Sequence, residues 1–180
     1  KDGKKILGVL IPVAEEAARI STKSKVGVIG TKATVYSKAY QTEIQKIDPE
    51  IKVIQKACPL LVPLIEEGWH NKPEAISILK KYLRPLKTNN IDTLILGCTH
   101  YPFMIKHIKR FMGKRVKTLH SGEITAKSLK NYLARHPEIE SKLSKNKSRT
   151  YLTTDSPTEF MRFAEKNLDM HIDTPEKIVL

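Results

Sequence analysis

The feature that most constrains this chain is the alternation of short, continuous apolar runs with amphipathic stretches over its first two-thirds. The apolar runs are Ile6–Ile11, Val26–Gly30, Ile51–Ile54, Thr93–Gly97 and Val116–Leu119. Runs of this length suit strands that are buried on both faces of a sheet. Segments of helical period separate them, over 12–19, 35–47, 76–86 and 103–112. We therefore predict an α/β fold: a parallel sheet flanked by helices on both faces.

The last third of the chain has a different pattern. We predict a helix from Ser121 to about Arg135, a polar loop or short helix over 136–149, a short strand at Tyr151–Thr153, a helix capped at Asp155 or Ser156, and a final strand at Ile178–Leu180. The composition changes near residue 120. We therefore expect one α/β domain over residues 5–119 and a separate C-terminal segment over residues 120–180.

Composition excludes several classes of protein. The chain has 180 residues, of which 40% are hydrophobic, enough for a core of ordinary size. No apolar stretch approaches the roughly 18 residues that a membrane span needs, and no apolar segment of a secretory signal opens the chain. Two cysteines are too few for a disulfide framework, so we expect a reducing, cytoplasmic location and no membrane.

The net charge of +13 suggests a nucleic-acid partner. However, the Lys and Arg residues are spread evenly along the chain, and aromatic residues make up only 6% of it. A surface dedicated to nucleic acid usually concentrates charge and adds aromatic side chains for stacking. The most basic run, over 106–117, falls mainly on the solvent face of a predicted helix. We therefore favour solvated helix faces over nucleic-acid binding, which a salt-dependent DNA retention assay would test.

The first candidate site follows the strand at Thr93–Gly97, because parallel sheets bind ligands at the carboxyl ends of their strands. Cys98 lies there, just before a predicted helix whose N–H groups and dipole would lower the pKa of its thiol. His100 is near enough to exchange a proton with it, and Thr99 adds a hydroxyl and a backbone donor. The alternative is an inert buried cysteine and a histidine satisfied within a turn.

Two further loops offer candidates. Thr31 and Thr34 follow Gly30 and present hydroxyls beside free N–H groups, which suits a carboxylate or phosphate. The alternative for Thr34 is that it only caps a helix. Glu66 and Glu67 follow an apolar stretch, and one of them could pair with His100, although two solvated glutamates are the simpler interpretation. Cys58 could pair with Cys98, and no Cys/His spacing typical of a metal site is present.

Four segments together resemble one known family, the bacterial glutamate racemases. Leu94–Phe103 (LILGCTHYPF) closely resembles the second catalytic-cysteine motif of that family. Lys25–Gln41 is similar to its GVIGT-x-x-T segment, Ala57–Gly68 to its ACPL-x-VP-x-x-E segment, and Leu152–Phe163 to its late LTT-x segment. The segments occur in the family's order and span nearly the whole chain.

The resemblance implies two similar α/β domains with the active site between them. It implies cofactor-independent interconversion of L- and D-glutamate for peptidoglycan synthesis, with two cysteines on opposite faces of the α-carbon. Carried onto this sequence, Cys98 would be the second cysteine, His100 would assist it, and Glu66 would be the acidic neighbour of His100. Thr99, Thr34 and Thr31 would bind the substrate.

The chain also departs from the family. The D-S-G, P-Y-G and C-N-T segments of the family's first domain are not found here, and Cys58 matches a position without a catalytic role. The resemblance therefore implies the C-terminal part of a racemase, inactive alone, whose residues from about 120 onward would pack on the absent first domain. A homodimer is compatible with it. The alternatives are a related aspartate racemase, a non-catalytic basic protein that binds gyrase or nucleic acid, and a truncated reading frame without activity.

Overall fold

The computed structural model describes residues 6–168 and 171–179, and the first part of the chain is built on a four-stranded parallel sheet. The strands are β1 (Lys25–Gly30), β2 (Lys52–Ala57), β3 (Thr93–Gly97) and β4 (Lys117–His120). Their order across the sheet is β2-β1-β3-β4, and every neighbouring pair is parallel. The predicted α/β fold is therefore confirmed.

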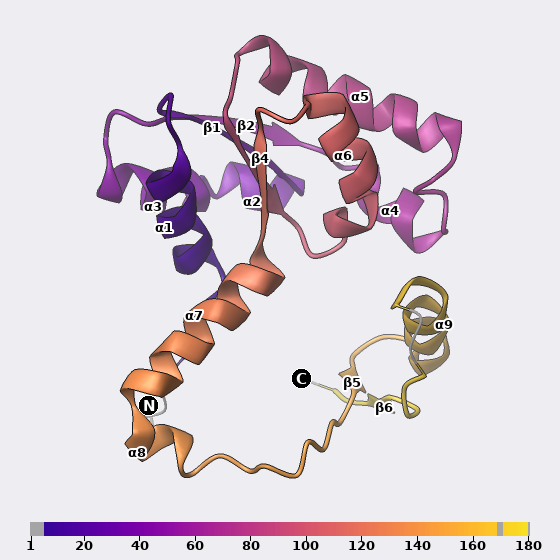
Figure 1. The fold of residues 1–180 in the computed structure, drawn as a ribbon. Helices are drawn as coiled ribbons and strands as arrows, with labels where there is room; N and C mark the ends of the chain where they lie inside the picture. The colour runs from indigo at the N-terminus through magenta and orange to yellow at the C-terminus, as the bar shows by residue number, and fades with distance from the viewer. Residues whose placement is uncertain (1–5, 169–170, 180) are drawn as a thin grey trace. The chain divides into compact units, whose positions relative to one another are not determined.

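Helices cover both faces of this sheet (Figure 1). One face carries α1 (Leu10–Ile20) and α3 (Ala39–Ile47), and α7 (Ser121–Arg135) contacts α1. The other face carries α5 (Pro73–Thr88) and α6 (Ile105–Met112), with α4 (Leu61–Glu66) and the 3-10 helix η1 (Tyr101–Met104) beside them. A short helix, α2 (Lys32–Tyr36), follows β1 directly.

The continuous apolar run of β1 follows from its place in the middle of the sheet. Val26 and Val28 pack into the core formed with α1 and α3. Gly27 points to the opposite face, where a Cβ atom would lie only 2.5 Å from Ile91 Cδ1 and 3.4 Å from Leu86 Cδ2. Both faces of β1 are thus closely covered, as the sequence pattern indicates.

Two predicted strands are wrong. The run Ile6–Ile11 forms no strand, because α1 already begins at Leu10 and buries Pro12, Val13, Ala14 and Ala17 at helical spacing. The apolar side chains before it are exposed, and Ile6 retains 94% of its accessible surface. At the other end, the last strand β6 is Glu176–Lys177 rather than Ile178–Leu180, and residue 180 lies outside the described part.

Two predicted helices are each divided. The helix expected over 35–47 is split into α2 and α3 at Lys38, which has φ of 53° in the left-handed region. The segment expected as one helix over 103–112 begins as η1 and continues as α6. Gly113, with φ of 88°, ends α6, as its sequence position predicts.

The chain divides into two compact units, one up to His136 and one from Pro137 onward. The helix α7 belongs to the first unit, because it packs against α1, so the boundary follows α7 rather than preceding it. The second unit holds α8 (Pro137–Glu140), β5 (Leu152–Thr153), α9 (Pro157–Leu168) and β6, with β5 and β6 paired in parallel. Within the described residues, every helix is too short or too polar to span a bilayer.

Candidate active site

The candidate site lies where the order of the strands reverses. The chain passes from β1 to β2 on one side and then returns to β3 on the other side of β1. The carboxyl ends of β1 and β3 therefore flank the switch point at which open α/β sheets bind ligands. Gly30 and Gly97, the last residues of these strands, are register partners. Thr31 and Cys98 directly follow them.

The structure brings Cys98, His100 and Glu66 into one chain of contacts. The Cys98 Sγ atom lies 3.9 Å from His100 Nδ1, and His100 Nε2 lies 3.3 Å from Glu66 Oε1. The His100 side chain is 28% exposed and that of Glu66 is 54% exposed, so the histidine is the more enclosed partner. This order of groups can carry a proton between a thiol and an imidazole whose other nitrogen is held by a carboxylate.

The expectation of a lowered pKa for Cys98 is wrong. Burial is the largest influence and raises the pKa of this thiol. The backbone N–H groups of His100 and Tyr101 lower it, and the negative charge of Glu66 raises it further. Burial therefore outweighs the N–H groups at the start of the helical segment that follows. Deprotonation of Cys98 therefore needs a nearby base, which His100 can provide.

The two threonines after β1 link the loops at the switch point. Thr31 Oγ1 accepts a hydrogen bond from Thr34 N at 3.3 Å, so Thr31, rather than Thr34, caps α2. Thr34 Oγ1 lies 3.0 Å from Thr31 Oγ1 and donates to the Gly97 carbonyl at 3.4 Å. Thr34 thus joins the β1 loop to the strand that ends before Cys98. Thr99 is exposed, next to Cys98 in sequence.

Cys58 has a different environment from Cys98. Its side chain is fully buried, its Sγ donates to the Lys56 carbonyl at 3.4 Å, and burial raises the pKa of its thiol to about 12. Because β1 lies between β2 and β3, the strands before the two cysteines are about 9.5 Å apart. That separation exceeds the Cα distance of a disulfide, so the structure gives no support to a cysteine pair. Glu67 is exposed, and Glu66 is the one that meets His100.

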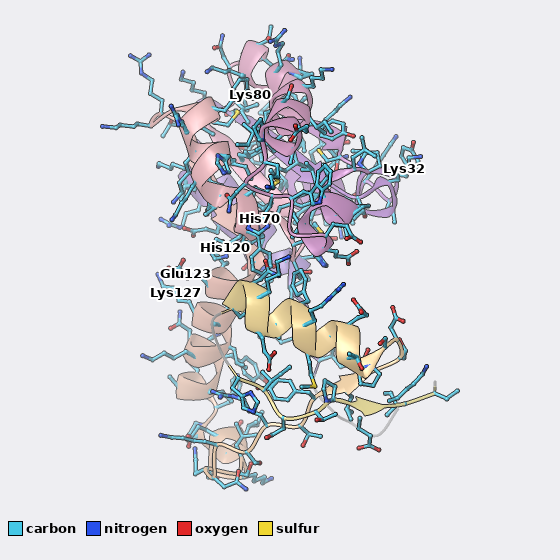
Figure 2. The ribbon with its side chains drawn as sticks, turned by 90° about the vertical axis from the view of Figure 1, so that its right-hand side faces the viewer. Lys32, His70, Lys80, His120, Glu123 and Lys127 are labelled. Carbon is cyan, nitrogen blue, oxygen red and sulfur yellow. The ribbon has the colours of Figure 1, made fainter. Side chains whose placement is uncertain are left out.

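Two residues at this edge of the sheet were missed in the sequence. Tyr40 is 5% exposed and its ring lies against Gly97, but its position reads simply as the apolar face of a helix. His120 ends β4 beside Leu96, with Nε2 3.7 Å from Glu123 Oε2 at the start of α7 (Figure 2). Its place at a strand end could have identified it. Among the described residues there is no group of three His, Cys, Asp or Glu able to hold a metal ion.

Comparison with known proteins gives a consistent result. The chain is similar to the glutamate racemase of Geobacter metallireducens, with 39% identity over 163 residues, and to that of Thermoanaerobacter sp., with 40% identity over 172 residues. These matches cover 91% and 93% of this chain but only 60% and 63% of the relatives. The chain therefore spans less than two-thirds of the length of the curated relatives that it matches.

Solved structures agree with the sequence matches. The glutamate racemase isoform RacE1 of Bacillus anthracis has a TM-score of 0.87 at 33% identity, with 99% of this chain and 66% of that chain covered. The glutamate racemase of Francisella tularensis, solved in complex with D-glutamate, has a TM-score of 0.82 at 30% identity, with 95% and 62% covered. The family model of the Asp/Glu/Hydantoin racemases matches residues 4–129. The chain belongs to the Asp/Glu/Hydantoin racemase family.

Proposed function

We propose that this chain forms one half of a glutamate racemase active site and that Cys98 is its proton-transferring thiol. The observation that carries the proposal is the Cys98–His100–Glu66 contact chain at the switch point of the sheet. The likeness of nearly the whole chain to glutamate racemases supports the choice of reaction. Within cells, such an activity would supply D-glutamate for peptidoglycan in the cytoplasm.

The chemistry requires a base on one face of the α-carbon and an acid on the other. A thiolate removes the α-proton as the C–H electron pair stays on carbon, and a thiol on the opposite face then donates a proton to that carbanion. One thiol is protonated and the other deprotonated at the end, so nothing else is consumed. A single residue cannot readily serve both faces, and Cys98 would serve one of them.

His100 would prepare Cys98 for this step. Burial raises the pKa of the Cys98 thiol, so a thiolate forms there only if a neighbouring base takes the proton. His100 Nδ1 faces the sulfur, and Glu66 contacts the other ring nitrogen. Glu66 would therefore fix the orientation of the ring and stabilise its protonated form.

Groups that suit an anionic substrate lie on the loops that follow β1 and β3. The hydroxyls of Thr31 and Thr34 lie at the end of β1, and Thr99 is exposed beside Cys98 in sequence. Hydroxyls and free backbone N–H groups at the end of a strand bind carboxylates well. We therefore assign substrate binding to these three threonines.

The opposite thiol would come from a first domain of the kind that the resemblance implies. Cys58 cannot supply it, since its side chain is fully buried and its sulfur donates to the Lys56 carbonyl. The relatives are longer by more than a third of their own length, which leaves room for such a domain. We also infer that the second unit, from Pro137 onward, packs on that domain.

Racemisation followed by circular dichroism tests the proposal. The 180-residue chain alone should not change the circular dichroism signal of an L-glutamate solution. The same chain joined to the first domain of the Bacillus anthracis relative should do so; Cys98→Ala should abolish turnover, and Cys58→Ala should retain it. Turnover by the chain alone, or by the Cys98→Ala hybrid, would contradict the assignment. Faster turnover of L-aspartate than of L-glutamate would favour an aspartate racemase.

A further inference from the structure

The backbone just before Cys98 is confined on three sides. A Cβ atom on Gly97 would lie 3.0 Å from the Ile29 carbonyl oxygen, 3.1 Å from Tyr40 Cε2 and 3.3 Å from Thr34 Cγ2. One contact is backbone from the neighbouring strand, and the other two are side chains that reach across from the β1 side. A Cβ atom at Gly97 would therefore force its neighbours to give way by a few tenths of an ångström, so the backbone here is closely packed.

Tyr40 is held firmly enough to impose this restraint. It lies in the first turn of α3, directly after the left-handed break at Lys38, and Ser37 Oγ ties that break to the Thr34 carbonyl at 2.9 Å. The ring belongs to the buried core with Ile44, Val28 and Ile95. Burial first, and then the charge of Cys98, raise the pKa of Tyr40, which agrees with a ring packed against the residue before this thiol.

The position of Cys98 matters because its sulfur lies 3.9 Å from His100 Nδ1, and because two backbone N–H groups act against the effect of burial on the pKa of its thiol. The N–H groups of His100 and Tyr101 favour the thiolate, whereas burial opposes it. Burial persists if the Gly97–Cys98 backbone shifts slightly, but hydrogen bonds weaken steeply with distance and angle. A loose backbone would therefore lose the stabilising contribution and keep the unfavourable one.

We propose that Tyr40 is a positioning residue for Cys98: its ring packs against Gly97 and holds the Gly97–Cys98 backbone where the Cys98 sulfur lies 3.9 Å from His100 Nδ1. Tyr40 touches no reacting atom in this arrangement and acts only through Gly97. The relevance to catalysis rests on the proposed function of Cys98. The positioning itself is a property of the thiol, which can be measured without any turnover.

The test is the pH dependence of iodoacetamide alkylation at Cys98, followed by mass spectrometry of the 180-residue chain. Tyr40→Phe retains the ring and should keep the wild-type rate and midpoint. Tyr40→Leu should raise the midpoint and slow alkylation about tenfold at a pH below it, the effect of one pH unit on a thiolate-dependent rate. Tyr36→Leu, at an exposed tyrosine of α2, is the matched control and should change neither quantity.

Two further measurements keep the outcome clear. Cys58, which is fully buried, should stay unlabelled in every variant that remains folded, so each sample carries its own folding control. Gly97→Ala strains the same contacts and should shift the midpoint in the same direction. An unchanged or lowered midpoint in both Tyr40→Leu and Gly97→Ala, with Cys58 protected, would overturn the proposal. A Tyr40→Phe shift as large as that of Tyr40→Leu would also overturn it, since the hydroxyl rather than the ring would then be responsible. If the Cys98→Ala variant kept its turnover in the racemisation assay, the proposed function would be refuted, but the effect of Tyr40 on the alkylation of Cys98 would still stand.

Discussion

At the scale of single residues, Cys58 and Cys98 differ because equivalent positions at two strand ends have different surroundings. Cys58 donates to a carbonyl of its own strand and is fully covered. Cys98 has an imidazole within 3.9 Å and keeps partial access to solvent. The chemistry of a cysteine is set by such neighbours rather than by its place at the end of a strand.

This difference predicts the order of alkylation. With a pKa of about 12, fewer than about one in a thousand Cys58 thiols is ionised at pH 8.5, and the side chain is closed to reagent as well. Iodoacetamide at pH 8.5 should therefore label Cys98 first and spare Cys58 in the folded chain. Peptide mapping by mass spectrometry checks this, with labelling in denaturant as the control in which both react. Earlier labelling of Cys58 under native conditions would count against the structure of the site.

Glu66 allows a second prediction in which two readouts move apart. Its charge raises the pKa of Cys98, so Glu66→Gln should lower the midpoint of Cys98 alkylation, slightly because Glu66 is half-exposed. In a complete racemase site the same change should slow turnover by at least about tenfold, because His100 loses the carboxylate that orients it.

Glu67→Gln is the matched control for this experiment. Glu67 is exposed and adjacent in sequence, so its replacement should leave both the alkylation midpoint and the racemisation rate unchanged. If Glu66→Gln lowered the alkylation midpoint without slowing racemisation, the contact between Glu66 and His100 would have no part in catalysis.

At the scale of elements, the end of the sheet opposite to the site is secured by one buried carboxylate. Asp92 precedes β3 and is 7% exposed. Its side chain accepts hydrogen bonds from Ser21 Oγ at 2.9 Å, Thr22 N at 2.6 Å and Lys23 N at 2.5 Å. These donors all lie in the connection between α1 and β1. A single side chain thus joins the entry of β1 to the entry of β3, the two strands that carry the candidate site at their other ends.

Asp92→Asn should destabilise the first unit by about 2 kcal/mol, since the amide keeps one acceptor but presents donors to N–H groups. Urea unfolding followed by circular dichroism measures this free energy. Asp48→Asn is the control, because Asp48 accepts one backbone bond at an exposed turn and its amide can keep that bond. A difference between the two variants below about 0.5 kcal/mol would contradict the assigned role.

The same carboxylate predicts a pH dependence with a definite sign. Burial acts to raise the pKa of Asp92, but the hydrogen bonds from Ser21, Lys23 and Thr22 together outweigh it and lower the pKa below its usual range. A depressed pKa stabilises the folded state fully above the unfolded value, about 3.9, and this stability is lost as the pH falls through the folded value. Asp92→Asn should therefore flatten the loss of stability below about pH 4, which unfolding curves at stepwise lower pH would show.

The sequence predicts strands well where both faces of the strand are buried, and it predicts elements poorly where only one face is buried. Val26–Gly30 and Thr93–Gly97 are covered on both faces, so an unbroken apolar run identifies both strands. The equally apolar run at Ile6–Ile11 is misleading, because its last residues belong to α1, whose buried side chains from Pro12 to Ala17 have helical spacing. Contacts between distant loops, such as that of Tyr40 with Gly97, depend on the tertiary arrangement and leave no local pattern.

The candidate site is predictable to a similar extent. The position of Cys98 at a strand end and the nearness of His100 follow from spacing alone. The contact of His100 with Glu66 rather than Glu67, and the raised pKa of Cys98, depend on tertiary packing and burial, which local sequence does not reveal.

At the scale of the whole molecule, the two units differ in how much apolar surface they bury. The first has a continuous core between its sheet and both helical layers. Among the described residues of the second, Ala164 and Ile172 are the buried hydrophobic side chains, while Leu152, Phe160 and Leu168 are at least 40% exposed. A unit of this size with so small a core lacks the hydrophobic stabilisation that independent folding requires. This small core agrees with the proposal that another domain stabilises the second unit.

Limited proteolysis should reveal this difference. Residues 141–150 are all exposed and contain Lys142, Lys145, Lys147 and Arg149, whereas the more basic run over 106–117 lies largely on α6, which packs against α5. Trypsin cuts backbone that can leave its hydrogen bonds, so it should cleave the first run long before the second, although the second offers more target side chains. Mass spectrometry should then show a stable fragment that ends between residues 142 and 149, and the peptide released from the second unit should be degraded further. In a separate experiment, a synthetic 137–180 peptide should give the circular dichroism spectrum of an unfolded chain. A helical, protease-resistant 137–180 peptide would mean that this unit needs no partner domain, and the inference that it packs on a first racemase domain would lose its physical basis.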